Sequence, residues 1–202
     1  ETKALWAQDQ WYITPELKFT VGGRYEDWRG YDGLNVNGST RVVQPTVEGQ
    51  KFSPKGLLTW KASDKWVLTA ALAKAYRFAT AAELYQLVST GTTFTSPNPD
   101  LKPDNVTSAE LRAERKFERA SVQLSLFQDD VHDAIISQFG TLVQGSPQLY
   151  SFVSNVDHVR ARGAELAFGT NDVLLRGLAF SSNLTFVEPK TLAMSGRASA
   201  TA

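Results

Sequence analysis

Three carboxylates and one of the chain's two histidines lie within the segment QDDVHD, residues 128–133. Carboxylate oxygens and imidazole nitrogens are common metal ligands, so this segment has the residue types of a cation site. In an extended strand, Asp129 and Asp133 point to one face, whereas Asp130 and His132 point to the other. The side chains therefore do not converge on one ion. We expect no metal here, but a solvated polar rim at the outer end of a strand.

The pair Asp157-His158 has the residue types of a charge relay, in which a carboxylate orients a histidine base. Adjacent residues of a strand point to opposite faces, so these two side chains cannot act on each other directly. No GxSxG nucleophile motif accompanies them. We therefore expect no catalytic residues, no cofactor and no enzymatic activity. A membrane-embedded protease or lipase is the less favoured alternative.

The elements that carry these residues alternate polar and apolar side chains with a period of two. In residues 17–28, LKFTVGGRYEDW, the odd positions up to Tyr25 are apolar or glycine, and the even positions are mostly polar. A strand separates the two sets, whereas a helix would mix them. The same alternation recurs in residues 51–60, 65–76, 108–117, 120–127 and 178–186. About eight such segments, each near or above the ~9–11 residues that cross a bilayer at a tilt, predict an all-β chain.

The links between these segments alternate in length along the chain. The short links are residues 13–16, 62–65, 118–119 and 169–172, and the long links are residues 29–50, 77–105 and 140–148. Antiparallel transmembrane barrels have short turns at one end and long loops at the other, whereas the turns of a soluble sandwich recur more evenly. We therefore predict an antiparallel transmembrane β-barrel. A soluble β-rich binding domain is the less favoured alternative.

Aromatic side chains fall at both ends of the predicted strands. Trp60 and Trp66 flank one tight turn, and Tyr25 and Trp28 end a strand on the opposite side. Two such levels match the interfacial girdles of membrane barrels. Lys74 lies on the apolar face eight residues from Trp66, a rise of roughly 19 Å at ~3.3 Å per residue and ~45° tilt. Lys74 is therefore expected near the edge of the ~25 Å apolar band, where it can reach anionic headgroups.

The composition excludes several functions and leaves the membrane question to the strands. Lys plus Arg and Asp plus Glu both number 21, so the formal net charge is zero and no nucleic-acid partner is expected. Cysteine is absent, which excludes disulfides and thiolate metal sites. No segment has the ~18 apolar residues of a membrane helix, and no N-terminal signal peptide is present. Because the pattern starts and stops without returning partners, we expect residues 1–188 to be part of a larger barrel and residues 189–202 a truncated outer loop or tail.

Residues 96–105, SPNPDLKPDN, lead from the longest loop into the next strand. Their prolines fix φ and withhold N–H groups, so sheet pairing cannot run further outward. Pro103 also biases Lys102 toward extended geometry, which aims the chain back into the wall. We expect this segment to be the point where a long outer loop re-enters the sheet.

Four segments stand in the order and at the spacing of a known family. They are WAQDQW (6–11), AYRFATAAELYQ (75–86), NPDLKPDN (98–105) and NVDHVRARGAEL (155–166). Together they resemble the barrel of TonB-dependent outer-membrane receptors of Gram-negative bacteria. The pairing of YRxxTxxEL with NPxLKPxN across one loop is the most specific signal. Ala79 stands where proline is common and Asp104 where glutamate is usual, and both departures are mild.

The resemblance implies a wide barrel of about 22 strands with an N-terminal plug. It implies location in the bacterial outer membrane and active import of a scarce ligand, such as a ferric siderophore, haem, cobalamin or a glycan. The implied partners are outer-membrane lipid and lipopolysaccharide, the ligand itself, and the inner-membrane TonB complex, which acts through the plug that this chain lacks. A passive porin-like channel is the alternative within the membrane class.

Tyr76, Arg77, Glu83 and Tyr85 lie at the start of the longest outward loop and are the candidate ligand-binding residues. Aromatic and guanidinium groups at such a place can meet a ligand. They can equally anchor the loop to the barrel mouth, with Glu83 paired to Arg77, and anchoring is the interpretation that we favour. Gly163 lies in mid-strand, where we expect it to serve a bulge or a close backbone approach.

Overall fold

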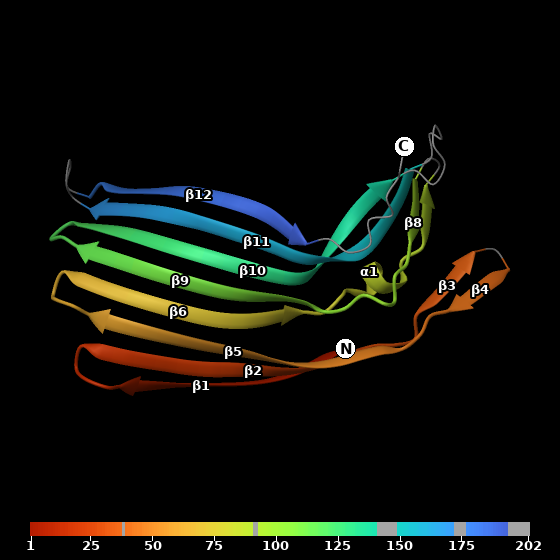
Figure 1. The fold of residues 1–202 in the computed structure, drawn as a ribbon, viewed down its shortest axis with the longest axis horizontal. Coiled ribbons are helices and arrows are strands. Elements are labelled where there is room, and N and C mark those ends of the chain that lie inside the picture. The colour runs from red at the N-terminus through yellow and green to blue at the C-terminus, as the bar shows by residue number, and fades with distance from the viewer. Residues whose placement is uncertain (38, 91–92, 141–148, 172–176, 194–202) are drawn as a thin grey trace.

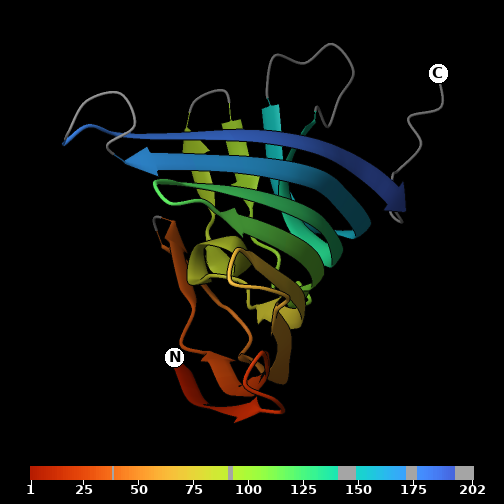
Figure 2. The same cartoon turned by 90° about the vertical axis from the view of Figure 1, so that its left-hand side faces the viewer.

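The computed structural model describes residues 1–37, 39–90, 93–140, 149–171 and 177–193. Eight long strands pair antiparallel in chain order within one sheet (Figure 1). They are β1 (Thr2–Tyr12), β2 (Leu17–Gly30), β5 (Val47–Lys61), β6 (Trp66–Arg77), β9 (Asp104–Lys116), β10 (Ala120–Gly140), β11 (Leu149–Asn171) and β12 (Ala179–Ala193). Figure 2 shows the sheet curving from β1 to β12 like a section of a barrel wall. The predicted all-β antiparallel wall is confirmed.

Tight turns join neighbouring strands at one end of the sheet, and long links leave from the other end (Figure 1). Residues 13–16, 62–65 and 117–119 form three of the tight turns, while residues 31–46 and 78–103 form two long links. For these five links, the lengths are sorted as the sequence predicts. The predicted links at 140–148 and 169–172 lie largely outside the described residues or within β11.

The long links contain short elements that the alternation pattern does not predict. β3 (Leu34–Asn37) and β4 (Thr40–Val43) form a separate two-stranded hairpin. α1 (Ala81–Tyr85) precedes β7 (Val88–Thr90) and β8 (Thr93–Ser96), and β8 pairs parallel with the outer end of β11. Strands of three or four residues have too few alternating positions to stand out in a sequence. No helix among the described residues is long or apolar enough to cross a membrane.

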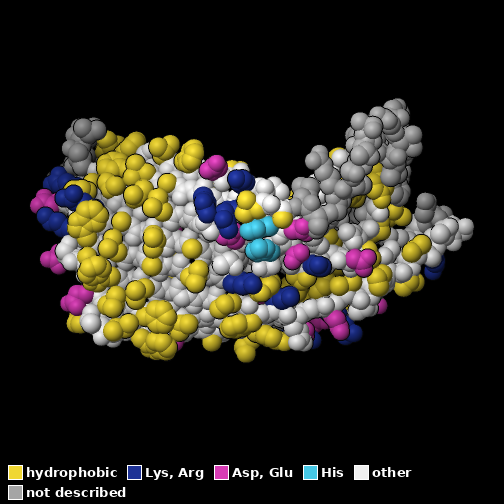
Figure 3. Space-filling view, in the orientation of Figure 1, with side chains coloured by type: hydrophobic (Ala, Val, Ile, Leu, Met, Phe, Trp, Pro, Cys, Tyr) yellow, Lys and Arg dark blue, Asp and Glu magenta, His cyan; other side chains and the backbone are white. Residues whose placement is uncertain are grey.

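The two faces of the long strands differ in chemistry. On the outer face, Leu72, Leu111 and Phe186 leave 60%, 62% and 71% of their surface exposed. Figure 3 shows hydrophobic side chains gathered over the part of the sheet nearest the tight turns. The opposite face carries charged residues such as Glu110 and Arg112, which are paired with each other. An exposed apolar surface of this extent on one face is typical of a wall that meets lipid.

The buried hydrophobic cluster lies at the loop-bearing end of the sheet. It consists of Ala79, Leu84, Tyr85, Leu101 and Val153. Among the described residues, the long strands form a single layer, and the residues of the buried cluster are not on the apolar outer face of that layer. Burial therefore occurs where the long links fold against the outer ends of the strands.

β10 and β11 bend at Asp133, whose φ of 53° lies in the left-handed region that Asp tolerates better than most residues. Asp133 drops out of the pairing between the two strands, in which His132 pairs with His158 and Ala134 with Val156. β10 then continues to Gly140. The expectation that residues 128–133 form the outer end of their strand is therefore wrong. They lie in the middle of β10, just before it turns away from the wall (Figure 1).

The last described strand passes the boundary expected at residue 188. β12 continues beyond Glu188 to Ala193 and pairs with β11 over this stretch, with a register shift between His158 and Val159. Proline at position 189 is tolerated there because β12 has no described partner on its other side. Residues 194–202, the rest of the expected loop or tail, lie outside the described residues.

Candidate functional site at the mouth of the sheet

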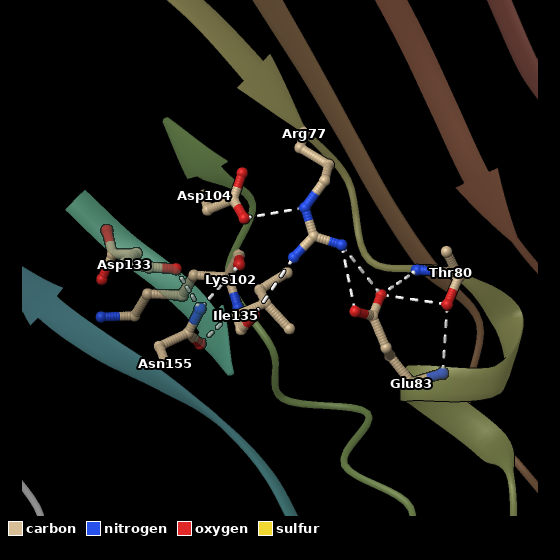
Figure 4. A network of polar contacts seen from close by, with 8 residues as sticks. All are labelled: Arg77, Thr80, Glu83, Lys102, Asp104, Asp133, Ile135 and Asn155. Carbon is tan, nitrogen blue, oxygen red and sulfur yellow. Dashed lines mark hydrogen bonds and ion pairs between the residues drawn. The ribbon is translucent and has the colours of Figure 1, made fainter. Parts of the chain in front are cut away.

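Arg77, the last residue of β6, joins three segments of the chain (Figure 4). Its Nε donates to the Asp104 carboxylate at 2.8 Å, and its Nη1 donates to the Glu83 carboxylate at 3.0 Å. Its Nη2 reaches the carbonyl oxygen of Ile135 at 3.4 Å. A guanidinium carries five donors in a rigid fork, which allows one side chain to bridge two carboxylates. The expected pair of Glu83 with Arg77 is present, and the same arginine also reaches β9 and β10.

The helix α1 begins with a capping box. The Glu83 backbone N–H donates to the Thr80 hydroxyl at 3.3 Å, and the Thr80 backbone N–H donates to the Glu83 carboxylate at 2.7 Å. Such a box satisfies donors that the first helical turn leaves unpaired. Burial disfavours the charged form of Glu83, but the hydrogen bonds from Thr80 and Arg77 outweigh it and lower the pKa of the carboxyl. One ionised carboxylate therefore stabilises both the helix start and the arginine.

The side chain of Asn155, in β11, is hydrogen-bonded to both the proline-rich segment, residues 96–105, and the bend at Asp133 (Figure 4). Its Oδ1 accepts from the Lys102 backbone N–H at 2.9 Å, and its Nδ2 donates to the Lys102 carbonyl oxygen at 3.0 Å. The same Nδ2 donates to the carbonyl oxygen of Asp133 at 2.6 Å. The Asn155 amide thus satisfies the N–H and carbonyl groups of Lys102 and the carbonyl group of Asp133. These groups lie beside prolines or at a left-handed residue, where regular strand pairing is interrupted.

Two other residues of the proline-rich segment, Asn98 and Leu101, also attach it to the protein. Asn98 donates through Nδ2 to the carbonyl oxygen of Val153 at 2.8 Å, and Leu101 is buried with 5% of its surface exposed. β9 begins at Asp104, immediately after Pro103. The prediction that residues 96–105 return the long loop to the wall is confirmed.

Tyr85 connects the two long links to each other. Its hydroxyl donates to the carbonyl oxygen of Pro45 at 2.9 Å. Burial raises the pKa of this hydroxyl, so it remains a protonated donor. Nearby, the rings of Trp28 and Phe78 stack with centroids 5.1 Å apart. We call Arg77, Thr80, Glu83, Asp104 and Asn155, with the groups that they contact, the mouth network.

The four candidate ligand-binding residues therefore have different surroundings. Arg77 and Glu83 face each other, and Tyr85 has only 8% of its surface exposed. These contacts favour anchoring of the loop over direct contact with a ligand. The sequence reasoning missed Asn98 and Asn155, although each opens one of the four family-like segments.

Tyr76, the fourth candidate, lies outside the mouth network. The ammonium groups of Lys51 and Lys74 each lie 5.2 Å from the centre of its ring. An aromatic face attracts cations at this range, so Tyr76 holds two positive charges beside the mouth. The arrangement can present positive charge to an anionic group in solution or at a membrane surface.

A second polar cluster lies on the outer face, which we call the outer-face ladder. Its members are Gln128, Asp130 and His132 of β10 and His158, Arg160 and Arg162 of β11. One Asp130 oxygen accepts from Arg160 Nε at 2.6 Å and contacts His158 Nε2 at 2.8 Å. Arg162 Nε donates to Gln128 Oε1 at 2.7 Å. Figure 3 shows the two histidines, in cyan, at the border of the apolar surface.

The outer-face ladder contains residues from both sites that we considered in the sequence, the cation site in residues 128–133 and the charge relay of Asp157 and His158. His158 contacts Asp130 across the strands, and its ring stacks on that of His132 with centroids 4.2 Å apart. Within the described part of the chain, no three histidine or carboxylate side chains are grouped so that they could hold a metal ion. The sequence could not reveal these contacts because the register between β10 and β11 is not encoded in either strand alone.

Gly163 has the close contact that the sequence predicts. A Cβ built on it would collide with the ring of Phe127 and lie 2.5 Å from the carbonyl oxygen of Phe186. Of the two roles expected for Gly163, a bulge or a close backbone approach, the structure shows the close approach; the register shift between β11 and β12 lies between His158 and Val159. Glycine is required because the Phe127 ring crosses directly over the backbone of the neighbouring strand.

Comparison with known proteins identifies the architecture. The sequence profile of the family described as "TonB dependent receptor-like, beta-barrel" matches residues 1–201. The comparison with curated protein sequences gives no match.

Solved structures resemble this chain in fold. The copper transporter OprC is 18% identical with a TM-score of 0.73, covering 95% of this chain and 29% of that one. The siderophore receptor PirA from Pseudomonas aeruginosa is 17% identical with a TM-score of 0.72, covering 94% and 34%. The FrpB iron transporter from Neisseria meningitidis is 16% identical with a TM-score of 0.62, covering 94% and 26%. The chain therefore spans about a third or less of the length of these proteins.

Proposed function

Because this chain belongs to the TonB-dependent receptor β-barrel family, we propose that it forms part of the wall and outer mouth of an active transporter in the bacterial outer membrane. The family is one of transporters and receptors rather than enzymes. Here the long strands are the membrane wall, the tight turns face the periplasm, and the long links face the outside of the cell.

The observation that carries this proposal is the fixed position of the long links at one end of the wall. Arg77 ties the start of one link to β9 and β10, and Asn155 ties its end to the bend at Asp133. Binding loops are commonly held on a rigid scaffold in this way. A passive channel also needs loops, but import of a scarce ligand requires loops held in one geometry.

We propose that the imported ligand is a metal or a metal chelate of the ferric siderophore class. Support comes from the copper transporter, the siderophore receptor and the iron transporter whose folds resemble this one. Haem, cobalamin and glycans are the other ligand classes to test. Arg77, Glu83 and Tyr85 act in this proposal by positioning the loop, and Tyr76 is the candidate for direct contact with a ligand. Energy comes from the TonB complex through the plug of the full-length receptor.

The test is ligand uptake by cells that carry or lack the full-length receptor. Radiolabelled ferric siderophore, haem and cobalamin and a labelled oligosaccharide are supplied in turn, in the presence and absence of TonB. We expect accumulation of one of them that requires both the receptor and TonB. The proposal is overturned if loss of the receptor changes the uptake of none of the probes. Uptake that persists without TonB, together with large ion conductance in planar bilayers, would instead support the passive channel.

A further inference from the structure

The pairing between β5 and β6 ends partway along the wall, although both strands continue outward. β5 pairs with β6 from the tight turn only as far as Lys55 and Ala73. The β2–β5 ladder continues to the first residue of β5, and the β6–β9 ladder continues to the last residue of β6. The next residue outward on β5 is Pro54, which has no N–H to donate to a neighbouring strand. We call the boundary between residues 47–54 of β5 and residues 74–77 of β6, which lacks backbone pairing in the described structure, the seam.

The seam begins at the level where the wall leaves the membrane. Lys74, its first residue on β6, lies eight residues beyond Trp66, a rise of roughly 19 Å at ~45° tilt. Within the ~25 Å apolar band, backbone groups must pair within the protein because no water is present to satisfy them. Outward of that band, water can hydrogen-bond the groups that face the seam. β5 can therefore separate from β6 outside the membrane without loss of backbone pairing inside it.

Side chains close the seam in place of a backbone ladder. The ring of Phe78, which follows β6, stacks on that of Trp28 in β2, with centroids 5.1 Å apart. Phe78 crosses Gly49 of β5 on the way, and a Cβ built on Gly49 would lie 3.2 Å from its ring. The link that follows β6 thus reaches across β5 to β2 through one aromatic contact.

Two further contacts cross the seam. The Tyr85 hydroxyl of α1 donates to the carbonyl oxygen of Pro45, just before β5, at 2.9 Å. The Lys51 ammonium group lies 5.2 Å from the centre of the Tyr76 ring. Each contact depends on one or two side chains, whereas the ladders on either side are continuous runs of backbone hydrogen bonds. The seam is therefore the boundary at which this part of the outer wall separates most readily.

Each side of the seam is tied together internally. On one side, Arg77 joins β6 and α1 to β9 and β10, and Asn155 joins the end of the same link to β11. On the other side, Arg29 of β2 pairs with Glu48 of β5 at 3.6 Å, and the β3–β4 hairpin extends from these two strands. Each long link is therefore fixed to its own strands and moves with them.

We propose that the mouth of the receptor opens along the seam, and that the ligand enters while it is open. The outer ends of β2 and β5 move with the β3–β4 hairpin, and the outer ends of β6 and β9 move with α1. The hinge lies at Lys55 and Ala73, the last pair of the β5–β6 ladder, and Phe78 and Tyr85 hold the closed form. The role in ligand entry rests on the proposed transport function, whereas the opening itself follows from the strand pairing.

The first test measures distances across the seam in the full-length receptor, reconstituted in lipid bilayers. These 202 residues contain no cysteine, so spin labels are attached at Thr46→Cys and Ala82→Cys, two exposed positions on opposite sides of the seam. Pulsed electron paramagnetic resonance should give one main distance in the parent. In Phe78→Ala, a second population should appear whose distance is longer by about 5 Å or more, the spacing of neighbouring strands.

The matched control places the labels at Ala82→Cys and Ser137→Cys, which both lie on the β6 side of the seam. Their distance should be the same in the parent and in Phe78→Ala. Tyr85→Phe keeps the ring and loses only its hydroxyl bond, so it serves if Phe78→Ala folds poorly, and it should give a smaller long-distance population. The proposal is overturned if neither variant lengthens the distance across the seam, or if both label pairs broaden alike.

The second test restrains the seam during uptake. A cleavable crosslinker that matches the closed distance joins the Thr46→Cys and Ala82→Cys positions, and uptake of ferric siderophore, haem, cobalamin and oligosaccharide probes is measured. Uptake should fall about tenfold or more, because a conformational step needed in every cycle is blocked, and it should recover on cleavage. Crosslinking Ala82→Cys to Ser137→Cys should leave uptake unchanged.

Uptake that is unaffected by the crosslink across the seam would overturn the proposal. Absence of uptake before any crosslinking would contradict the proposed transport function instead, and the distance measurements would then still decide whether the seam opens.

Discussion

The mouth network and the outer-face ladder are both built from arginine and carboxylate, but they use these groups differently. In the mouth network, one arginine is shared by Glu83 and Asp104, on two segments far apart in the sequence. In the ladder, Asp130 takes one arginine, and a second arginine is left with a neutral partner, Gln128. The first cluster closes contacts within the protein, and the second leaves charge available outside it.

The position of a polar cluster on the wall determines which groups its side chains contact. The mouth network lies where the long links fold over the strand ends. Its side-chain hydrogen bonds replace backbone hydrogen bonds between strands, which the prolines and the left-handed Asp133 prevent. The ladder lies on regular strands whose backbone groups are already paired. Its side-chain hydrogen bonds are therefore additional to the backbone pairing of these two strands.

The largest effect should come from Arg77→Ala in the full-length receptor. This change removes the bonds to Glu83, Asp104 and the Ile135 carbonyl together, and hydrogen bonds to charged groups are worth about 1.5–3 kcal/mol each before solvent exposure reduces them. We expect amide hydrogen exchange in residues 78–90 to become about tenfold faster or more.

Arg112→Ala is the control for that experiment. Arg112 is similarly exposed, 43% against 45% for Arg77, but it pairs only with Glu110 of its own strand among the described residues. Its loss should leave exchange in the loop unchanged. Equal acceleration by both variants would contradict the view that Arg77 ties separate segments together.

Asn155→Ala should have the next largest effect, on the proline-rich segment. It leaves the Lys102 N–H and two carbonyl oxygens without their side-chain partner, at a cost of about 1–2 kcal/mol of local stability. Proteolysis between residues 96 and 105 should then become faster. Asn155→Asp keeps the acceptor and loses the donors, so its rate should fall between those of Asn155→Ala and the parent. A parental rate for Asn155→Ala would show that Asn155 does not hold this segment.

Asp130→Asn should change stability by less than about 1 kcal/mol, since the ion pair with Arg160 is only partly buried and asparagine keeps an acceptor oxygen for the arginine. The thermal unfolding midpoint of the purified receptor measures this change. Hydrogen exchange at the mouth should be unaffected, because Asp130 contacts only members of the ladder among the described residues. Loosening of residues 78–90 in this variant would mean that the two clusters are coupled.

The smallest effect should be the pH dependence of α1. The pKa of Glu83 is lowered in the folded loop, so its contribution to stability is fully present above the ordinary value of 4.5 and is lost as pH falls through the folded value. Exchange of α1 amides, corrected for the intrinsic rate, should accelerate over that interval. Glu83→Gln should exchange faster at neutral pH and show no such step. A step that persists in Glu83→Gln would assign it to another group.

Much of the wall could be predicted from the sequence because the two faces of each strand meet different surroundings, so polar and apolar residues alternate along the strand. The long strands, the sorted links and the Arg77–Glu83 pair follow from that pattern and from the family-like segments. The bend at Asp133 could not be predicted, since most aspartates in strands keep negative φ. The contact of Asp130 with Arg160 depends on strand register, and the burial of Tyr85 depends on the fold of two loops.

The most direct test is the depth of the outer face in a lipid bilayer. Spin labels are placed on the full-length receptor, one at a time, at outward positions Ala70, Leu72, Lys74, Leu126 and Gln128. Their relaxation by oxygen and by a water-soluble nickel complex then measures exposure to lipid and to water. We expect relaxation dominated by oxygen at residues 70, 72 and 126 and a change toward relaxation by nickel at residues 74 and 128. Relaxation dominated by nickel at all five positions would contradict an outer face that contacts lipid between the tight turns and residues 74 and 128.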